Sequence, residues 1–262
     1  MSKRKTKWGE GTYRRYLKEG RGKGDLSEYK PWITTHDFPS LGTVTRVRGN
    51  VTNRIHHLLS KLEFQCFLYL ESLPGIEDIK EQYPLPLVHT QLIAARLGIE
   101  HPYINGFPYV MTTDFYYKRY NRWYAIQVKS SSALNNPRVQ EKLQIEKNFF
   151  EQIGVEWRLI TEKELNPDLT NNLLWLNSGA SLEQLIPDLE LQKELQSAFI
   201  ELYNDRTISF HTILQEIDSF FNFTLGTGMQ LFKFLVKTSQ IKLDLNRKIN
   251  LQDPRVLPYL KV

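Results

Sequence analysis

The stretch YVMTTDFYYKRYNRWYAIQVKSSS, residues 109–132, constrains the fold of this chain more than any other segment. Two runs of aromatic and β-branched side chains stand on either side of Arg119, Tyr120, Asn121 and Arg122. Aromatic and β-branched residues favour strands, and a short polar break between two such runs is typical of a β-hairpin. We therefore predict a hairpin here, and with it a sheet at the centre of the domain.

A helix is predicted before this hairpin. Ser60 followed three residues later by Glu63 fits a capping box, and the residues after it carry apolar side chains at helical spacing. Pro74 and Gly75 end the predicted helix. Cys66 occupies a core position on it, which favours an inert buried thiol.

Further elements alternate between strand and helix. We predict a strand within residues 76–87, a helix over 88–98, a long amphipathic helix that begins at Pro137 and ends before Gly154, and one more strand within 155–165. The order helix, strand, hairpin, helix, strand predicts a compact α/β core for a first domain, residues 1–166.

The sequence changes character after Asn166 and Pro167, where a second domain, residues 167–262, is predicted. It begins with a predicted helical segment rich in Leu, Glu, Gln and Asn, followed by two more predicted helices over 207–223 and 226–240. The last segment, IKLDLNRKINL, is predicted as a short hairpin that turns at Asn246 and Arg247. Helices followed by a two-stranded wing suggest a winged helix, although the apolar residues around Lys233 and Lys237 indicate that much of the second helix is core.

Charge is concentrated at the start of a chain of 262 residues whose formal net charge is +5. The first sixty residues hold thirteen Lys and Arg against five Asp and Glu, so this segment permits nucleic acid as a partner. We predict an arm there with a short helix over 12–19. Its KEGRGKGD motif lacks the spacing of a phosphate-binding loop, and is either a solvated, flexible connection or a basic contact to DNA phosphates.

The cysteine content and the hydropathy of the chain indicate the cellular compartment of the protein. Cys66 is the single cysteine, so no intramolecular disulfide forms and the chain suits a reducing compartment such as the cytoplasm. No stretch approaches the roughly 20 apolar residues that cross a bilayer, and the N-terminus has no apolar segment of the kind found in secretory signals. We therefore expect no membrane partner.

The predicted hairpin also carries a possible chemical centre. Asp114 lies on the first strand, and Gln127 and Lys129 lie two residues apart on the second, so their side chains share a face. Ile126 and Val128 point the other way, into a core. One face of the hairpin is thus expected to be dry and the other to be polar.

Glu63, on the preceding helix, supplies a further acid. Phosphodiester hydrolysis needs a hard divalent cation, oxygen ligands to hold it and a positive group near the attacking water. The proposed roles are that Asp114 bridges metals, Glu63 completes a site, Gln127 offers its amide oxygen or fixes a ligand, and Lys129 stabilises charge or positions water.

Each of these side chains has an ordinary explanation when it is taken alone. Glu63 has a capping role, Asp114 beside a threonine suits a strand edge, and Lys129 suits the guarded end of a strand. Gln127 is the oddest, but a structural hydrogen bond would satisfy its amide. The ordered combination is what favours a nuclease.

Two other groups of residues lie outside the predicted site. His56 and His57, beside Arg54, are interpreted as structural or weakly DNA-binding, because adjacent histidines lack the spacing of a zinc site. The aromatic residues of the hairpin could stack on unpaired bases, though cross-strand packing explains them. These aromatic residues are Tyr116, Tyr117, Tyr120, Trp123 and Tyr124.

The ordered set of Glu, Asp and Gln-x-Lys resembles the restriction-endonuclease-like nucleases, with Gln127 in place of their second acid. In the TnsA endonucleases of heteromeric bacterial transposases, glutamine is the expected residue at that position. Several segments resemble TnsA in the same order, and they span the first domain. They are KEGRGKG with YKPWIT, GNVTNRIHHLLSKLE, DIKEQYPL, VMTTDF, AIQVK, EKLQIEKNFFEQIGVEW and TEKELNP.

The resemblance implies a restriction-endonuclease-like (PD-(D/E)xK type) first domain and a winged-helix-like second one. It implies catalysis by Glu63, Asp114, Gln127 and Lys129, with Mg²⁺ held by the first three, two ions in number, and Mn²⁺ as a substitute. Glu146 matches an acidic position of that family and is expected to support the site.

The same resemblance implies a setting for the activity. TnsA subunits cut the non-transferred strand near the 5′ ends of a transposon during cut-and-paste transposition, in the bacterial cytoplasm. The implied partners are double-stranded DNA, a TnsB-like transposase that cuts and joins the other strand, and a TnsC-like ATPase bound through the second domain. Two alternatives remain open at this point: a stand-alone restriction or repair nuclease, and a non-catalytic DNA-binding adaptor.

Overall fold

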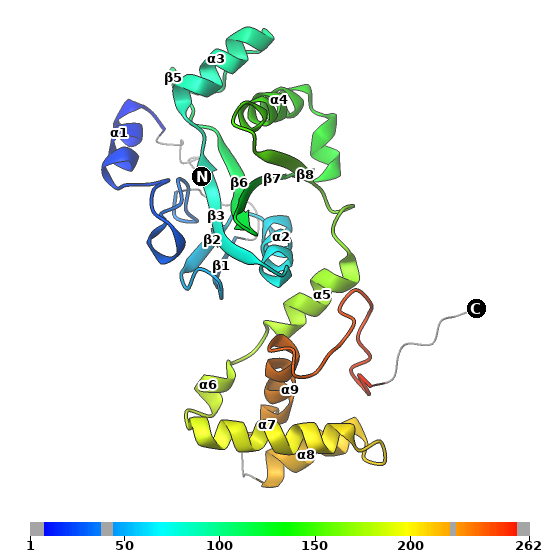
Figure 1. Cartoon of the computed structure of the whole chain (residues 1–262). Helices are drawn as coiled ribbons and strands as arrows, with labels where there is room; N and C mark the ends of the chain where they lie inside the picture. The colour runs from blue at the N-terminus through cyan, green and yellow to red at the C-terminus, as the bar shows by residue number, and fades with distance from the viewer. Residues whose placement is uncertain (1–7, 38–43, 221–223, 256–262) are drawn as a thin grey trace, which may run out of the picture. The chain divides into compact units, whose positions relative to one another are not determined.

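The structure, a computed structural model, describes residues 8–37, 44–220 and 224–255. The chain divides into two compact units, Met1–Leu165 and Asn166–Val262 (Figure 1). Each unit has a hydrophobic core of its own.

The first unit is built on a four-stranded sheet in the order β3-β6-β7-β8. Its strands are β3 (Ile76–Pro84), β6 (Thr112–Arg119), β7 (Arg122–Val128) and β8 (Glu156–Ile160). The first three are antiparallel, whereas β8 runs parallel to β7.

The hairpin predicted from the sequence is confirmed as β6 and β7. Tyr120 and Asn121 form its turn, and both have positive φ, 47° and 58°. Left-handed conformations at the two central residues are the signature of a type I′ turn, whose twist matches that of the flanking strands. The aromatic residues pack across the strands as expected, and Tyr117 stacks on Tyr124 at a centroid distance of 5.2 Å.

Helices cover both faces of this sheet (Figure 1). Phe67, on α2 (Lys61–Ser72), stacks on Phe115, which pairs with Ile126 across the hairpin. Ala125 points to the opposite face, where it packs with residues of α3 (Leu87–Leu97) and α4 (Pro137–Gln152). Residues 125–128 are all buried, so the polar side chain of Gln127 is covered as well as the apolar ones.

The predicted helix ends agree with the structure. The Ser60 hydroxyl accepts the Glu63 backbone N–H at 3.1 Å, which caps α2, and the Asn136 side chain caps α4 directly before Pro137. Gly98 ends α3 with a φ of 66°, a conformation open to glycine.

The N-terminal segment is packed against the first unit, in contrast to the predicted arm. It holds α1 (Glu10–Lys18) and a 3-10 turn, η1 (Leu26–Glu28). Trp8, Tyr16 and Trp32 are buried with Ile33 and Val110 in one cluster. No helical or strand period predicts this packing, because its contacts are aromatic and do not repeat along the chain.

Arg21, in the glycine-rich motif, is held in the same segment. Its guanidinium lies over the Tyr16 ring at 3.6 Å from the centroid and donates to Asp37 Oδ2 at 2.6 Å and to the Trp32 carbonyl at 3.0 Å. Arg21 is therefore not a free basic contact, whereas Lys18 and Lys23 of the same motif are exposed. Residues 1–7 and 38–43 of the predicted arm lie outside the described residues.

Polar groups cover the outer edge of β3, which is the first strand of the sheet. The Trp32 N–H donates to the Gln82 carbonyl at 3.2 Å, and the Tyr29 hydroxyl donates to the Glu81 carbonyl at 3.1 Å. Arg54 Nη2 donates to the Ile79 carbonyl at 2.8 Å. Residues from the N-terminal segment and from a separate hairpin thus take up the hydrogen-bonding groups of this edge.

Four short strands and a second 3-10 turn complete the first unit. They are β1 (Thr45–Arg48), β2 (Ile55–Leu58), β4 (Tyr103–Ile104), β5 (Phe107–Pro108) and η2 (Ser131–Asn135). β1 pairs with β2 and β4 with β5, each pair antiparallel.

The second unit is helical in its described part. Its helices are α5 (Pro167–Leu176), α6 (Leu182–Leu185), α7 (Leu189–Asn204), α8 (Phe210–Phe220) and α9 (Thr227–Lys237). Phe199, Phe210 and Phe232 are fully buried at the centre of their packing. Lys233 is also buried, and its ammonium donates to the Ser178 carbonyl and hydroxyl, so this lysine serves the core.

The predicted hairpin over residues 241–251 is wrong. This segment contains a turn in which the Arg247 N–H donates to the Asp244 carbonyl at 3.2 Å, and no strand. The Asn172 side chain donates to the carbonyls of Leu245 and Arg247, which satisfies groups that a wing would pair between strands. Across all the described helices of both units, none is long and apolar enough to cross a membrane.

Candidate active site

Asp114 lies at the centre of the predicted site and is fixed by the hairpin itself. Phe115 pairs with Ile126, and Asp114 and Gln127, the next residue along each strand, are joined by a hydrogen bond. The Asp114 backbone N–H donates to Gln127 Oε1 at 3.0 Å, and the Val128 N–H donates to Asp114 Oδ2 at 2.8 Å. The carboxylate is only 6% exposed, so its position is set by these bonds rather than by solvent.

Lys129 directs its ammonium at this carboxylate. Its Nζ lies 3.3 Å from Asp114 Oδ2 and also donates to the Val128 carbonyl at 2.8 Å. Burial opposes the charged form, but the carboxylates of Asp114, Glu146 and Glu63 outweigh it and raise the pKa of Lys129. The site therefore keeps a positive charge beside two acids.

Glu63 reaches the same place from the first turn of α2. Its Oε2 accepts the Leu59 N–H at 2.9 Å and its Oε1 accepts the Ser60 hydroxyl at 2.9 Å, while the side chain is 8% exposed. Burial, followed by repulsion from Asp114, raises the pKa of Glu63 to about 7. The capping explanation is therefore confirmed, and the same carboxylate also faces Asp114, as the functional interpretation requires.

Gln82, on β3, links the two acids. Its Nε2 donates to Asp114 Oδ1 at 3.0 Å and makes a longer contact of 3.4 Å to Glu63 Oε2. Its Oε1 accepts the Thr112 hydroxyl at 3.0 Å. Sequence reasoning missed Gln82, although an amide inside a strand that is otherwise buried is the same signal that marked Gln127.

Gln127 is positioned differently from the other predicted ligands. Its Oε1 accepts the Asp114 backbone N–H, so the amide oxygen is already engaged. This favours the second of the roles considered for Gln127, in which it fixes the strand that carries Asp114. A carboxylate at this position would accept the same N–H, which explains physically how an acid and an amide can occupy one place in related sites.

Glu146, on α4, lies close enough to Lys129 and Asp114 to interact with both electrostatically. Its carboxyl is 2% exposed and accepts the Trp157 indole N–H at 2.9 Å. Burial raises the pKa of Glu146 to about 8. This acid faces the protein interior and contributes to the field around the lysine.

Other residues weighed from the sequence serve the core. Arg54 and His56 are buried and both bind Glu81, so Arg54 is not available to a phosphate. The Arg54 and His56 contacts hold the pKa of Glu81 down at about 2 despite complete burial. Cys66 is a free, fully buried thiol, as expected, and burial raises its pKa.

The donor set suits a hard cation held mainly by oxygen. In the described part of the chain no group of three or more His, Cys, Asp or Glu side chains could hold a metal ion. Glu63 and Asp114 face each other, and Glu146 is engaged by the Trp157 indole, so further oxygen ligands must come from amides, backbone carbonyls, water or the DNA phosphate. Two carboxylates that converge on a shared amide N–H fit a small divalent cation.

Two family models and a curated relative match this chain. The family described as "TnsA-like endonuclease N terminal" matches residues 73–162, and the family described as "TnsA endonuclease C terminal" matches residues 164–245. The chain is 34% identical over 248 residues to "Transposon Tn7 transposition protein TnsA" of Escherichia coli. The alignment covers 94% of this chain and 90% of that relative. The chain belongs to the TnsA endonuclease family.

As a member of this family, the TnsA-type protein is an endonuclease. The N-terminal family match spans the sheet from β3 to β8, including Asp114, Gln127 and Lys129. The C-terminal match spans the five helices of the second unit. The mixed α/β architecture of a central sheet with covering helices is the one predicted from the sequence.

Proposed function

We propose that this TnsA-type endonuclease hydrolyses the non-transferred strand of double-stranded DNA at the 5′ ends of a transposon, with Mg²⁺ bound at Glu63 and Asp114. The observation that carries the proposal is the convergence of three groups from separate elements. Glu63 from α2 and Asp114 from β6, both buried, lie with the partly exposed Lys129, which directly follows β7.

Each side chain has a defined task in this proposal. A bound divalent cation, of which two would serve in-line displacement, lowers the pKa of water and neutralises charge on the phosphate, and Mn²⁺ can replace Mg²⁺. Glu63 and Asp114 hold the cation, and Gln127 holds Asp114 through its backbone N–H. The Lys129 ammonium orients the attacking water or stabilises charge on the phosphate.

The two units take separate parts in this function. We assign the nuclease to the first unit, as a restriction-endonuclease-like domain with its N-terminal segment, and partner binding to the second unit, as a diverged winged-helix-like domain without strands in its described wing segment. Residue 166 begins the second unit in the structure. The single, buried Cys66 suits a reducing bacterial cytoplasm.

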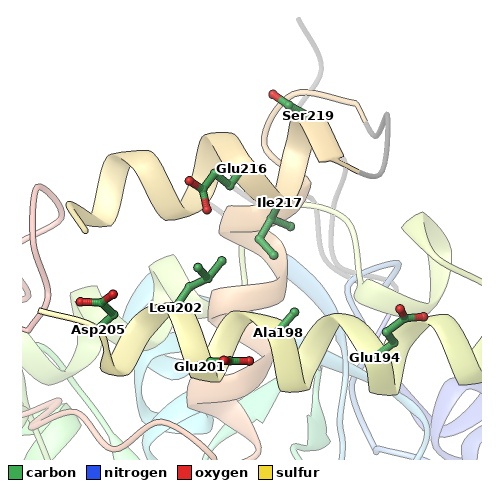
Figure 2. A pocket seen from close by; sticks show the side chains of 8 residues that line it. All are labelled: Glu194, Ala198, Glu201, Leu202, Asp205, Glu216, Ile217 and Ser219. Carbon is green, nitrogen blue, oxygen red and sulfur yellow. The ribbon is translucent and has the colours of Figure 1, made fainter. Parts of the chain in front are cut away.

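A groove in the second unit supports a protein partner. It lies between α7 and α8 and measures about 780 Å³ (Figure 2). Its floor is apolar, with Ala198, Leu202 and Ile217, and its rim is acidic. The acidic residues of the rim, all exposed, are Glu194, Glu201, Asp205 and Glu216. This chemistry repels DNA and fits a segment that presents Lys or Arg beside apolar residues, which we assign to a TnsC-like ATPase.

The decisive experiment is cleavage of a supercoiled plasmid that carries the element's ends, in the presence of the TnsB-like transposase and the TnsC-like ATPase. Asp114→Asn and Glu63→Gln abolish cleavage of the non-transferred strand and weaken Mg²⁺ binding measured by calorimetry. Lys129→Met keeps Mg²⁺ binding and slows cleavage by roughly 10²–10³-fold, because it removes only a stabilising charge. Cutting and joining of the other strand by the transposase continues in all three variants.

The same assay separates the alternatives. Cleavage of plain plasmid by the purified chain alone would indicate a stand-alone restriction or repair nuclease. Wild-type Mg²⁺ affinity below detection, with end cleavage unchanged in Asp114→Asn, would indicate a non-catalytic adaptor. Wild-type cleavage by Lys129→Met would contradict the role given to the lysine.

A further inference from the structure

Gln82 has an unusual backbone for a residue inside a strand. Its φ is 48°, and among the described strands it is the single non-glycine residue with a left-handed conformation. Residues other than Gly, Asn and Asp seldom adopt this region, and such strain persists where surrounding contacts impose it. Here the Trp32 N–H holds the Gln82 carbonyl from outside the sheet.

The side chain of Gln82 is held just as firmly. It is 3% exposed, its nitrogen faces Asp114 and Glu63, and its oxygen faces the Thr112 hydroxyl. Ionised carboxylate oxygens only accept hydrogen bonds, so in the metal-free site the nitrogen end of Gln82 faces Asp114. The amide N–H therefore supplies partial positive charge at the place where two acids converge.

A divalent cation bound by the same two carboxylates would favour the opposite orientation of the Gln82 amide. It would repel the amide hydrogens and attract an oxygen. A half-turn about the terminal bond of the side chain exchanges the nitrogen and oxygen of Gln82. Thr112 tolerates the exchange, because its hydroxyl donates to the amide oxygen in one orientation and accepts from the amide nitrogen in the other.

We propose that Gln82 is an oxygen ligand of the metal centre that switches by rotation of its amide, with Thr112 as the partner in both orientations. The proposal rests on the proposed function, since it needs the cation at Glu63 and Asp114. It supplies a further oxygen in a site where, among the described residues, no third Asp, Glu, His or Cys joins these two acids as a possible metal ligand. Gln127 cannot take this part as it stands, because its oxygen accepts the Asp114 backbone N–H.

The first test uses the wild-type chain, so it does not depend on the folding of a variant. The full-length protein is labelled with ¹⁵N at glutamine side chains and titrated with Mg²⁺. The Gln82 side-chain NH₂ resonance, identified by its loss in Gln82→Glu, should shift and saturate at the same concentrations as the heat of Mg²⁺ binding. A resonance that stays in place while the site fills would overturn the proposal.

The second test compares Mg²⁺ affinity by calorimetry, without DNA. Gln82→Met keeps the length of the side chain and removes the oxygen, and should bind Mg²⁺ about tenfold more weakly. Gln82→Glu keeps an oxygen that faces the cation, and should bind at least as tightly as wild type. The control Gln144→Met makes the same exchange at an exposed position of α4 and should leave the affinity unchanged.

Two further outcomes would overturn the proposal. Unchanged affinity in Gln82→Met would show that the oxygen is not a ligand, and tighter binding would show that the amide only competes with the cation. Failure of the proposed function has a different signature. In that case Asp114→Asn, measured alongside, would also leave Mg²⁺ affinity unchanged.

Discussion

At the scale of single residues, the site is defined by which atoms are already engaged. Asp114 has both carboxylate oxygens in hydrogen bonds, one to Gln82 and one to Val128 and Lys129. The pattern of Asp and then Gln-x-Lys was enough to predict that these residues gather, because strand periodicity sets their spacing. It could not predict that Gln127 binds a backbone N–H, since that depends on the register of β6 and β7.

Gln127 offers a prediction on stability. Gln127→Met leaves the Asp114 backbone N–H buried without an acceptor, and should lower the free energy of unfolding by about 1–3 kcal/mol. Gln127→Glu keeps an acceptor for this N–H. Its free energy of unfolding should therefore fall less than that of Gln127→Met, in metal-free buffer at a low pH where the added acid is neutral. Thermal denaturation of the two variants measures the difference, and equal losses at low pH would contradict the role of the acceptor.

Asp37 offers a prediction on pH dependence. Its hydrogen bonds to Arg21 and Thr34 outweigh burial and lower its pKa from 3.8 to about 2. Because the folded pKa is depressed, the pair stabilises the protein above the unfolded pKa and this contribution is lost as pH falls from about 4 to 2.

The loss should be on the order of 1–2 kcal/mol, allowing for partial solvent screening of the pair. Denaturant unfolding at a series of pH values measures it. The variant Asp37→Asn removes the titrating group and should flatten this part of the profile. A variant profile that falls as steeply as wild type would contradict the assignment.

At the scale of helices and strands, residues with strong local effects were the most predictable. Ser60, Pro137, Gly98 and Gly154 marked helix ends that the structure shares, since caps and breakers act within one turn. The predicted hairpin at the end of the chain failed for the opposite reason. Its residues do alternate between apolar and polar. However, Asn172, on a helix far away in the sequence, donates to the carbonyls of Leu245 and Arg247 that strand pairing would use.

The α2 cap joins helix stability to the site. Ser60→Ala removes the acceptor for the Glu63 N–H and the donor to the Glu63 carboxylate, and should cost about 1 kcal/mol. Because Glu63 then loses one of its two fixed partners, end cleavage should also slow, whereas Ser60→Asp should recover the helix cap without recovering the hydroxyl donor. Unfolding and cleavage assays on both variants check this, and full activity in Ser60→Asp would contradict a positioning role for the hydroxyl.

At the scale of the whole molecule, each unit has its own hydrophobic core, so a substitution in one core should destabilise mainly that unit. Phe199 is fully buried in the second unit, where it stacks on Phe232 at a centroid distance of 5.9 Å. Phe199→Ala should destabilise that unit by about 3–5 kcal/mol. Scanning calorimetry should show its transition moving to lower temperature, while Mg²⁺ binding by the first unit is retained.

A loss of Mg²⁺ binding in Phe199→Ala would show that the two units depend on each other for folding. The matched variant Phe115→Ala, in the core of the first unit, should do the reverse. It should lower the other transition and abolish Mg²⁺ binding, because Phe115 adjoins Asp114 and pairs across the hairpin with Ile126.

The cover over the outer margin of β3 has a consequence for solubility. A strand with free N–H and C=O groups recruits strands from other molecules, and natural sheets block such margins. Here Trp32 and Tyr29 occupy the carbonyls that a second molecule would seek. A variant that lacks the chain up to Trp32 would expose the backbone groups of β3 to other copies of the protein. The segment around Tyr29 and Trp32 therefore also protects this nuclease against aggregation through strand pairing.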